Sequence, residues 1–396
     1  MIISMNNVQT AKYATLDELR KATAAGFALA PEVSLKYGLN VFFAPADVPL
    51  PFGEAAEVAR SEIRVPDGVT TYSFAEALLK PELAKRILEC LSAPDARAEK
   101  ISAWHGSQAG LGSLIIVPPN FSSEEPVRID LVFSDARRVE NVIVIVGEGS
   151  RVTVVEHLRS ADGSQFSAPD FKLRSSVTDV IVHPNAKATH ISLQDFAENV
   201  TDLSLKRATV KRDASMSWIE CVFGGGFSQS SAITELVEEG ASVRAKTQFF
   251  GRGTQKFDLS QNVRHIASNT HSELRTRGAL MDTAKTVYRG LVRVEKGTRG
   301  CVGHQKEDTL LLGEKAEIDA VPNLEIEAAD VRCGHGASVG RLDKEKLFYL
   351  MSRGLDEAAS RKFLVEGFFA PIVAEMRAGG LEDRVQCIID ERIAPL

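Results

Sequence analysis

The sequence has little of what marks a secreted, membrane or nucleic-acid-binding protein. Its five cysteines are scattered and form no Cys-x-x-Cys pair, so neither a disulfide framework nor a zinc knuckle is expected. It has no run of about 18 apolar residues, and its first residues lack the pattern of a secretory signal. A net charge of −6 without a basic run argues against phosphate-backbone binding. We expect a soluble cytoplasmic protein with reduced thiols.

Several catalytic motifs are also missing. The sequence contains no Gly-x-x-x-x-Gly-Lys-Ser/Thr loop, no dinucleotide-binding fingerprint, no Gly-x-Ser-x-Gly elbow and no His-Glu-x-x-His helix. These motifs cradle phosphates, present a nucleophile or bind zinc. We therefore expect a non-enzyme without an ATPase motif of its own.

Short runs of valine, isoleucine, threonine and phenylalanine, alternating with polar residues, fill the chain from about residue 105 to 340. Small residues recur at expected corners that begin with Gly149, Asn185, Asp213, Gly240 and Gly336. The intervals leave no room for crossover helices, so a β-sandwich or a solenoid remains. Repetition favours the solenoid, and the lack of a strict six-residue apolar step favours a right-handed parallel β-helix.

Helical patterns flank this segment, which divides the chain into three expected regions. Residues 1–104 are predicted to be an N-terminal helical region, with Ser/Thr-x-x-Glu starts at Thr15 and Ser73 and a bend or restart at Pro81. Residues 105–340 form the expected β-helix core. Residues 341–396 are predicted to be a C-terminal helical domain with helices over 343–353, 356–377 and 381–393, and Pro371 is expected to kink or divide the second.

The most informative stretch runs from Pro322 to Gly354, where two expected strands lead into a helix that begins at Asp343. Cys333 and His335 lie two residues apart on the second strand, so their side chains should point to the same face. A thiolate and an imidazole are suitable ligands for iron or an iron–sulfur cluster. Two ligands do not complete a site, so the rest would come from a partner. The structural alternative is a packed solenoid end.

These residues carry a family resemblance. The run from Leu324 to Gly354, together with SLIIVPPN, VIVGEGSRVTVVEH, SWIEC, AKTVYRG and TLLLGEKAEID in order, resembles the SufB/SufD scaffold subunits of the Suf iron–sulfur cluster assembly system. The resemblance extends from about Ser107 to the C-terminus, and its Cys-x-His-Gly-Ala form is closer to SufD than to SufB. It implies a right-handed parallel β-helix between helical segments.

Some positions depart from SufB. Where the resemblance places the assembly cysteine of SufB, this chain has Glu307, which we regard as a weaker candidate oxygen ligand. Leu158 stands where SufB carries a sulfur-accepting cysteine, whereas Gln194 and Lys211 match polar SufB positions. These differences favour a SufD-type subunit, although an undifferentiated homodimeric SufB/SufD form also fits.

The resemblance further implies partners. It predicts a SufC-type ABC ATPase bound by the C-terminal helices, for which the candidate contacts are Leu347, Phe348, Met351, Phe363 and Phe368. It also predicts a second scaffold, either a SufB-like subunit or a second copy of this chain, and a transient iron–sulfur cluster at the shared interface rather than one held by the isolated chain. Two other functions fit a β-helix: a polysaccharide-active enzyme, which would need acidic calcium ligands that this chain lacks on successive coils, and a purely architectural solenoid.

Overall fold

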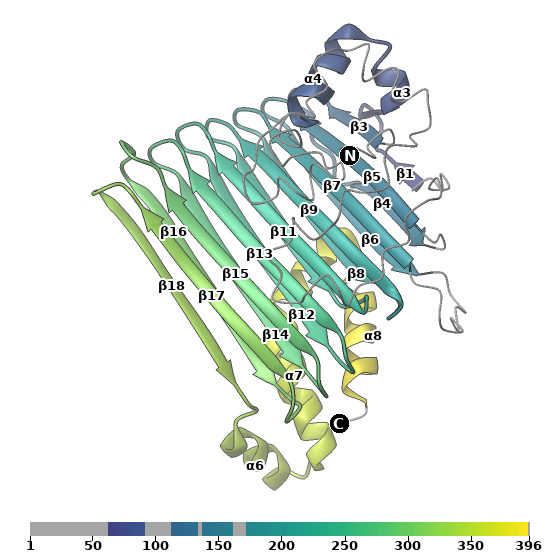
Figure 1. Ribbon diagram of the computed structural model, residues 1–396, viewed down its shortest axis with the longest axis vertical. Helices are drawn as coiled ribbons and strands as arrows, with labels where there is room; N and C mark the ends of the chain where they lie inside the picture. Colours follow the sequence, from purple (N-terminus) through teal and green to yellow (C-terminus); the bar gives the residue numbers. More distant parts are fainter. Residues whose placement is uncertain (1–61, 92–111, 134–136, 161–171, 395–396) are drawn as a thin grey trace, which may run out of the picture.

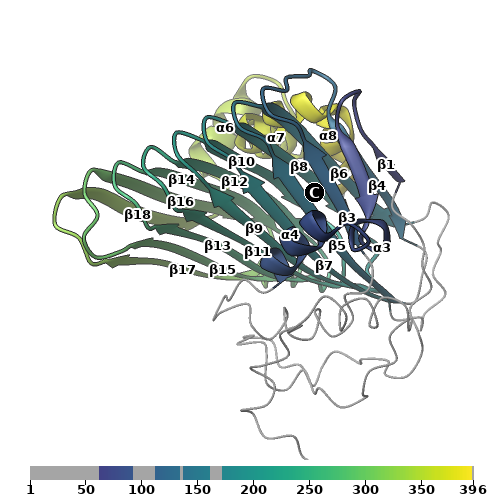
Figure 2. The same ribbon diagram turned by 90° about the horizontal axis from the view of Figure 1, so that it is seen from above.

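A computed structural model describes residues 62–91, 112–133, 137–160 and 172–394. The expected N-terminal helix start at Thr15 lies outside these residues. Two nine-stranded sheets face each other and account for most of the regular structure. Figures 1 and 2 show them as two stacked layers along the length of the molecule.

The strands of each sheet alternate along the chain, so consecutive strands mostly belong to opposite sheets. Sheet A contains, in spatial order, β1 (Glu62–Arg64), β4 (Val127–Phe133), β6 (Arg151–Ser160), β8 (Lys187–Asp195), β10 (Ser215–Val222), β12 (Ser242–Gly251), β14 (His271–Leu280), β16 (Cys301–Leu311) and β18 (Val331–Gly340). Sheet B contains β17 (Glu317–Ile326), β15 (Lys285–Val294), β13 (Lys256–His265), β11 (Phe227–Leu236), β9 (Val200–Val210), β7 (Lys172–Val182), β5 (Arg137–Val146), β3 (Gly112–Val117) and β2 (Thr70–Ser73).

Every pairing from β3 and β4 onward is parallel and in register between successive coils. Because alternate residues of a strand point to opposite faces, each strand sends one set of side chains between the sheets. The largest apolar cluster lies there and stacks valine, alanine and leucine from coil to coil. The expected parallel β-helix is therefore confirmed.

The corners that lead from sheet B to sheet A between β5 and β14 follow one rule. Each of them has a residue with positive φ, such as Asn185, Asp213 or Gly240, followed by a small buried residue such as Ala214 or Ala241. The expected corner at Gly336 is wrong, because Gly336 lies inside β18. Gly334 and Gly336 give this stretch the composition of a turn, but the strand continues through both of them.

At the N-terminal end of the solenoid, β1 pairs antiparallel with β4 and β2 pairs antiparallel with β3. Helices α3 (Phe74–Ala77) and α4 (Pro81–Leu91) follow β2. Ser73 caps α3, and Glu76 completes the predicted capping box. Pro81 begins α4, as a proline at the first helical position can. Phe74, Leu78 and Ile87 pack on the outer face of sheet B near β3 and β5.

The C-terminal helices cover the outer face of sheet A (Figure 2). They are α6 (Lys344–Ser352), α7 (Glu357–Val373), the 3₁₀ helix η3 (Ala374–Gly379) and α8 (Glu382–Ile393). Asp343 caps α6 as predicted. The α-helix continues through Pro371 and changes to 3₁₀ geometry only from Ala374.

The helices are bound to the sheet by apolar packing and by one buried cation. Val365 and Phe369 join a cluster with outward-facing residues of β8 and β10. Arg392 of α8 is buried and donates to the carbonyl oxygens of Phe250 at 2.7 Å and Phe223 at 2.5 Å. Among the described residues, no helix is long and apolar enough to cross a bilayer.

Candidate functional site

The last coil of the solenoid places Cys333 and His335 together. On β18, Cys333 lies opposite Gly303 and His335 lies opposite Gln305 of β16. Alternate residues of β16, from Cys301 through Gln305 to Thr309, are buried between the sheets. Cys333 and His335 therefore face the same interior, as the spacing of two predicted. In the described part of the chain, β17 and β18 each pair on one side only, so this end of the solenoid is open.

Cys333 is half-buried and packs against the apolar cluster. Burial raises the pKa of its thiol, while the backbone N–H of Gly303 counteracts part of this effect. Gly303 must be small, since a β-carbon there would lie 2.7 Å from Cγ1 of Val292 and 3.4 Å from Sγ of Cys333. The thiol thus needs a nearby cation or metal to become a thiolate at neutral pH.

Glu307 lies one coil deeper, opposite Ala337 of β18, and is 1% exposed. Its Oε1 accepts a hydrogen bond from the hydroxyl of Thr309, and its Oε2 has no hydrogen-bond partner. Burial raises the pKa of Glu307 to about 7, and the nearby Asp308 adds to the increase. The carboxyl can therefore change its protonation near neutral pH, within one coil of Cys333 and His335.

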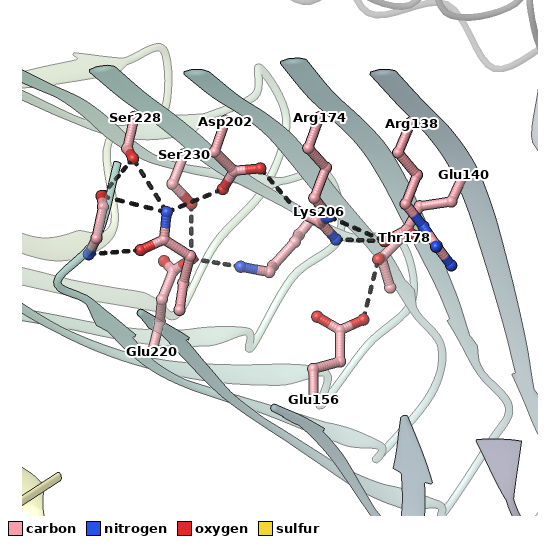
Figure 3. A network of polar contacts seen from close by, with 12 residues as sticks. Arg138, Glu140, Glu156, Arg174, Thr178, Asp202, Lys206, Glu220, Ser228 and Ser230 are labelled. Atoms are coloured by element: carbon pink, nitrogen blue, oxygen red, sulfur yellow. Dashed lines mark hydrogen bonds and ion pairs between the residues drawn. The ribbon is translucent and has the colours of Figure 1, made fainter. Parts of the chain in front are cut away.

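Polar and charged side chains continue from this end into the interior of the solenoid. We call this set the polar lane; it comprises Glu140, Glu156, Arg174, His190, Gln194, Asp202, Lys206, Glu220, Thr247, Gln261, Thr276, Tyr288, Gln305 and Glu307. Figure 3 shows the part of the lane in the first coils, where side chains from both sheets meet.

The charges in these first coils are paired. Arg174 forms ion pairs with Glu140 at 2.5 Å and Asp202 at 2.8 Å, and Lys206 forms one with Glu220 (Figure 3). Breaking such a buried pair leaves an unpaired ion where water cannot solvate it.

Glu156 lies near His190, with Oε1 3.4 Å from Nε2. Burial alone would raise the pKa of Glu156, but His190, Lys206 and Arg174 outweigh it and hold that pKa at about 2. Glu156 and Glu307 thus share one interior and have opposite pKa shifts, because cations surround only the first.

The sequence identified few of these lane residues. Gln194 lies in the lane and donates from Nε2 to Asp202 at 3.3 Å and to Ser228 at 3.0 Å. Lys211 lies outside it, at the corner after β9. The lysine in the lane is Lys206. A polar residue at an inward-facing position of a strand could have identified the other lane residues. That position can be assigned only when the register of the strands is known.

Leu158 is buried in an apolar cluster with Phe133 and Phe196. This side chain leaves no reactive group at the position where the resemblance places a sulfur-accepting cysteine in SufB. The chain therefore has no thiol at that point of β6.

The five candidate contacts on the C-terminal helices are not equivalent. Phe348 is 74% exposed and Phe363 is 59% exposed, and Met351 is also exposed. Leu347 is half-buried. Phe368 packs on the interface between helix and sheet, where its ring lies edge-on to Phe369 and its backbone carbonyl accepts from Arg277. Only the first three offer an apolar surface to a partner.

Comparison with known families decides what kind of solenoid this is. The family described as "SUF system FeS cluster assembly, SufBD core domain" matches residues 132–368. The chain belongs to this SufBD core domain family. The matched segment includes the interior of the solenoid, the open end with Cys333 and His335, and the helical surface around Phe348.

Individual relatives agree with the family. The chain is 29% identical over 297 residues to the iron–sulfur cluster assembly protein SufD of Bacillus subtilis, which covers 74% of this chain and 67% of that protein. It is 32% identical over 269 residues to an iron–sulfur cluster assembly SufBD family protein of Mycobacterium leprae, covering 67% of this chain and 30% of the relative. For a SufBD family protein of Staphylococcus saprophyticus the values are 29% over 283 residues, 71% and 60%. The chain thus spans less than two thirds of the last two relatives.

Proposed function

We propose that this protein is a SufD-type scaffold subunit that helps to build iron–sulfur clusters at an interface with a second scaffold. The observation that carries this proposal is the joint placement of Cys333 and His335 at the open end of the solenoid. Exposed strand edges pair readily with another chain. Val321, Ile326 and Val339 of the last coil are exposed apolar side chains, which favours a covered rather than a free end.

The ligand count supports a shared site. An iron–sulfur cluster usually takes four protein ligands, and the described part of the chain contains no group of three histidine, cysteine, aspartate or glutamate side chains arranged to hold a metal. Cys333 and His335 would supply two ligands, with Glu307 as a weaker oxygen donor behind them. The partner, either a SufB-like subunit or a second copy of this chain, would supply the rest, so the isolated chain would hold no stable cluster.

We further propose that an ABC-type ATPase binds the surface formed by Phe348, Met351 and Phe363. Three exposed apolar side chains on neighbouring helices are typical of a protein interface. The ATPase would supply the nucleotide chemistry for which this sequence has no phosphate-binding loop. A complex of this kind belongs in the reducing cytoplasm, which suits the unpaired cysteines of the described chain.

Affinity purification of the tagged protein from its native host tests the proposal. We expect an ABC-type ATPase to co-purify, together with a second scaffold subunit or an untagged copy of this chain. Phe348→Ala with Phe363→Ala should abolish ATPase recovery and spare the scaffold partner. Leu79→Ala is the matched control, because Leu79 is 73% exposed on the opposite end of the molecule.

Point variants are a sharper test than truncation. Removing residues 343–396 would uncover the apolar face of sheet A that Val365 and Phe369 cover, and the protein would aggregate for that reason alone. Unchanged ATPase recovery in the double phenylalanine variant would contradict the assigned surface.

A further inference from the structure

His335 has a single side-chain partner among the described residues, and that partner has a defined orientation. Nε2 of Gln305 lies 3.5 Å from Nδ1 of His335 and 3.1 Å from the backbone carbonyl oxygen of Asn323. A carbonyl oxygen can only accept a hydrogen bond, so the NH₂ group of Gln305 must face Asn323. The same NH₂ group then faces His335, and Nδ1 of His335 has to be the acceptor.

This contact favours one tautomer of the neutral ring. If Nδ1 accepts, the proton of the neutral imidazole lies on Nε2. Nε2 is then a hydrogen-bond donor without a lone pair for a metal ion. Histidines that ligate a metal usually donate the other ring N–H to an oxygen acceptor. In this arrangement His335 can donate to a sulfur or oxygen atom but cannot ligate iron through Nε2.

The surroundings of Gln305 permit a second orientation. Gln305 is 4% exposed, and its Oε1 has no hydrogen-bond partner. That oxygen lies close to Gly290. A β-carbon added to Gly290 would collide with Oε1 of Gln305, and the same β-carbon would lie 3.2 Å from the hydroxyl oxygen of Tyr288. The Tyr288 hydroxyl donates to Oε1 of Gln261 at 3.3 Å, so its own oxygen can still accept.

If the amide turned over, its NH₂ group would lie on the side of Gly290, and its oxygen would face both Nδ1 of His335 and the carbonyl oxygen of Asn323. The ring would then carry its proton on Nδ1 and present the lone pair of Nε2 at the open end. The turned orientation loses the hydrogen bond to Asn323 and sets two acceptor oxygens against each other, so the contacts within this chain favour the first orientation. A change at the interface is needed to select the second.

We infer that the side-chain amide of Gln305 is a positioning group that decides which ring nitrogen of His335 carries the proton, and so whether His335 meets a partner as a hydrogen-bond donor or as a metal ligand. The metal-ligand half of this inference rests on the proposed function. The tautomer half rests only on the contacts within this chain.

The tautomer can be measured directly by NMR of the full chain with ¹⁵N-labelled histidine, with His335→Ala to assign the signal. At a pH where the signal shows a neutral ring, we expect an unprotonated Nδ1 in the wild type. Gln305→Glu, which offers only acceptor atoms, should move the proton to Nδ1, and Gln305→Met should give a mixture. Gln261→Glu buries a carboxylate in the same lane without touching His335 and should leave its tautomer unchanged. A protonated Nδ1 in the wild type, or the same tautomer in all variants, would overturn the inference.

Cobalt(II), used alone as a spectroscopic probe, tests the consequence for metal binding. Gln305→Glu should bind Co²⁺ roughly tenfold or more tightly than wild type, with a thiolate band that disappears on Cys333→Ser. Tighter binding that survives the addition of His335→Ala would mean that the introduced carboxylate itself is the ligand, and would overturn the inference. If the tautomer behaves as expected but the complex with its partners forms no cluster, the proposed function fails and the inference about Gln305 stands.

Discussion

Replacing Glu307 by glutamine should stabilise the protein at pH 8 and change its stability little at pH 5. Glu307 is buried beside Thr309 and Asp308, and burial raises its pKa to about 7 from an ordinary value of 4.5. The folded protein therefore prefers the protonated carboxyl. Glutamine keeps the shape and the hydrogen bonding of that form without a charge that can appear.

The sign follows from proton binding. Between pH 4.5 and 7 the folded state holds a proton on Glu307 that the unfolded state has released, so stability falls as the pH rises through this range. Above about pH 7 the loss is complete. Since a tenfold change in an equilibrium corresponds to about 1.4 kcal/mol, the difference between the two pKa values amounts to about 3 kcal/mol. The glutamine variant avoids this loss.

Urea unfolding of the wild type and Glu307→Gln at pH 5 and pH 8 measures the effect. The quantity of interest is the change in unfolding free energy on substitution at pH 8 minus that at pH 5, which we expect to be about 3 kcal/mol in favour of the variant. Glu314→Gln is the control, because Glu314 is exposed at the corner after β16. Equal effects of Glu307→Gln at the two pH values would refute the reasoning that burial without a cation sets this pKa.

Three further outcomes are expected. Glu156→Gln should destabilise the protein by about 3 kcal/mol at pH 5, because the neighbouring His190, Lys206 and Arg174 lower its folded pKa to about 2 from an ordinary value of 4.5. Urea unfolding at pH 5 would contradict this if the variant were as stable as the wild type. Ala241→Asp should lower the free energy of unfolding by more than about 4 kcal/mol and abolish soluble expression, because Ala241 is 0% exposed at a stacked corner. A normal yield with an unchanged melting temperature would disprove this prediction. In the complex with its scaffold partner, Cys333→Ser and His335→Ala should each reduce cluster absorbance after anaerobic reconstitution. Cys387→Ser is the control, because this thiol is exposed, and it should leave the absorbance unchanged. Equal cluster yields in all variants would mean that Cys333 and His335 serve only in packing.

Local sequence determined much of the fold. The period of two on β18 was enough to put Cys333 and His335 on one face, because strand geometry alone fixes that relation. The caps at Ser73 and Asp343 were likewise readable, since a capping side chain bonds to amides within three residues of itself. Repetition of small corner residues indicated a solenoid, although the choice over a sandwich and the partners came from the family resemblance.

Local composition also misled in one place. Gly336 looked like a corner, but whether a glycine turns or extends depends on the strand beside it, and β16 holds it in the ladder. The capacity of glycine for either conformation is a property of the residue. Its actual conformation is decided by the neighbouring coil.

Only the tertiary structure decided the chemistry of the interior. Glu156 and His190 lie 34 residues apart in the sequence, and Lys206 meets Glu220 across the two sheets. Such contacts depend on the register of successive coils, which no local pattern encodes. The same holds for Glu307, whose carboxyl is ordinary by sequence and acquires a pKa of about 7 because the stacked coils remove water without supplying a cation. Sequence therefore determined which residues could face inward, and the stacking of coils determined which charges they would meet.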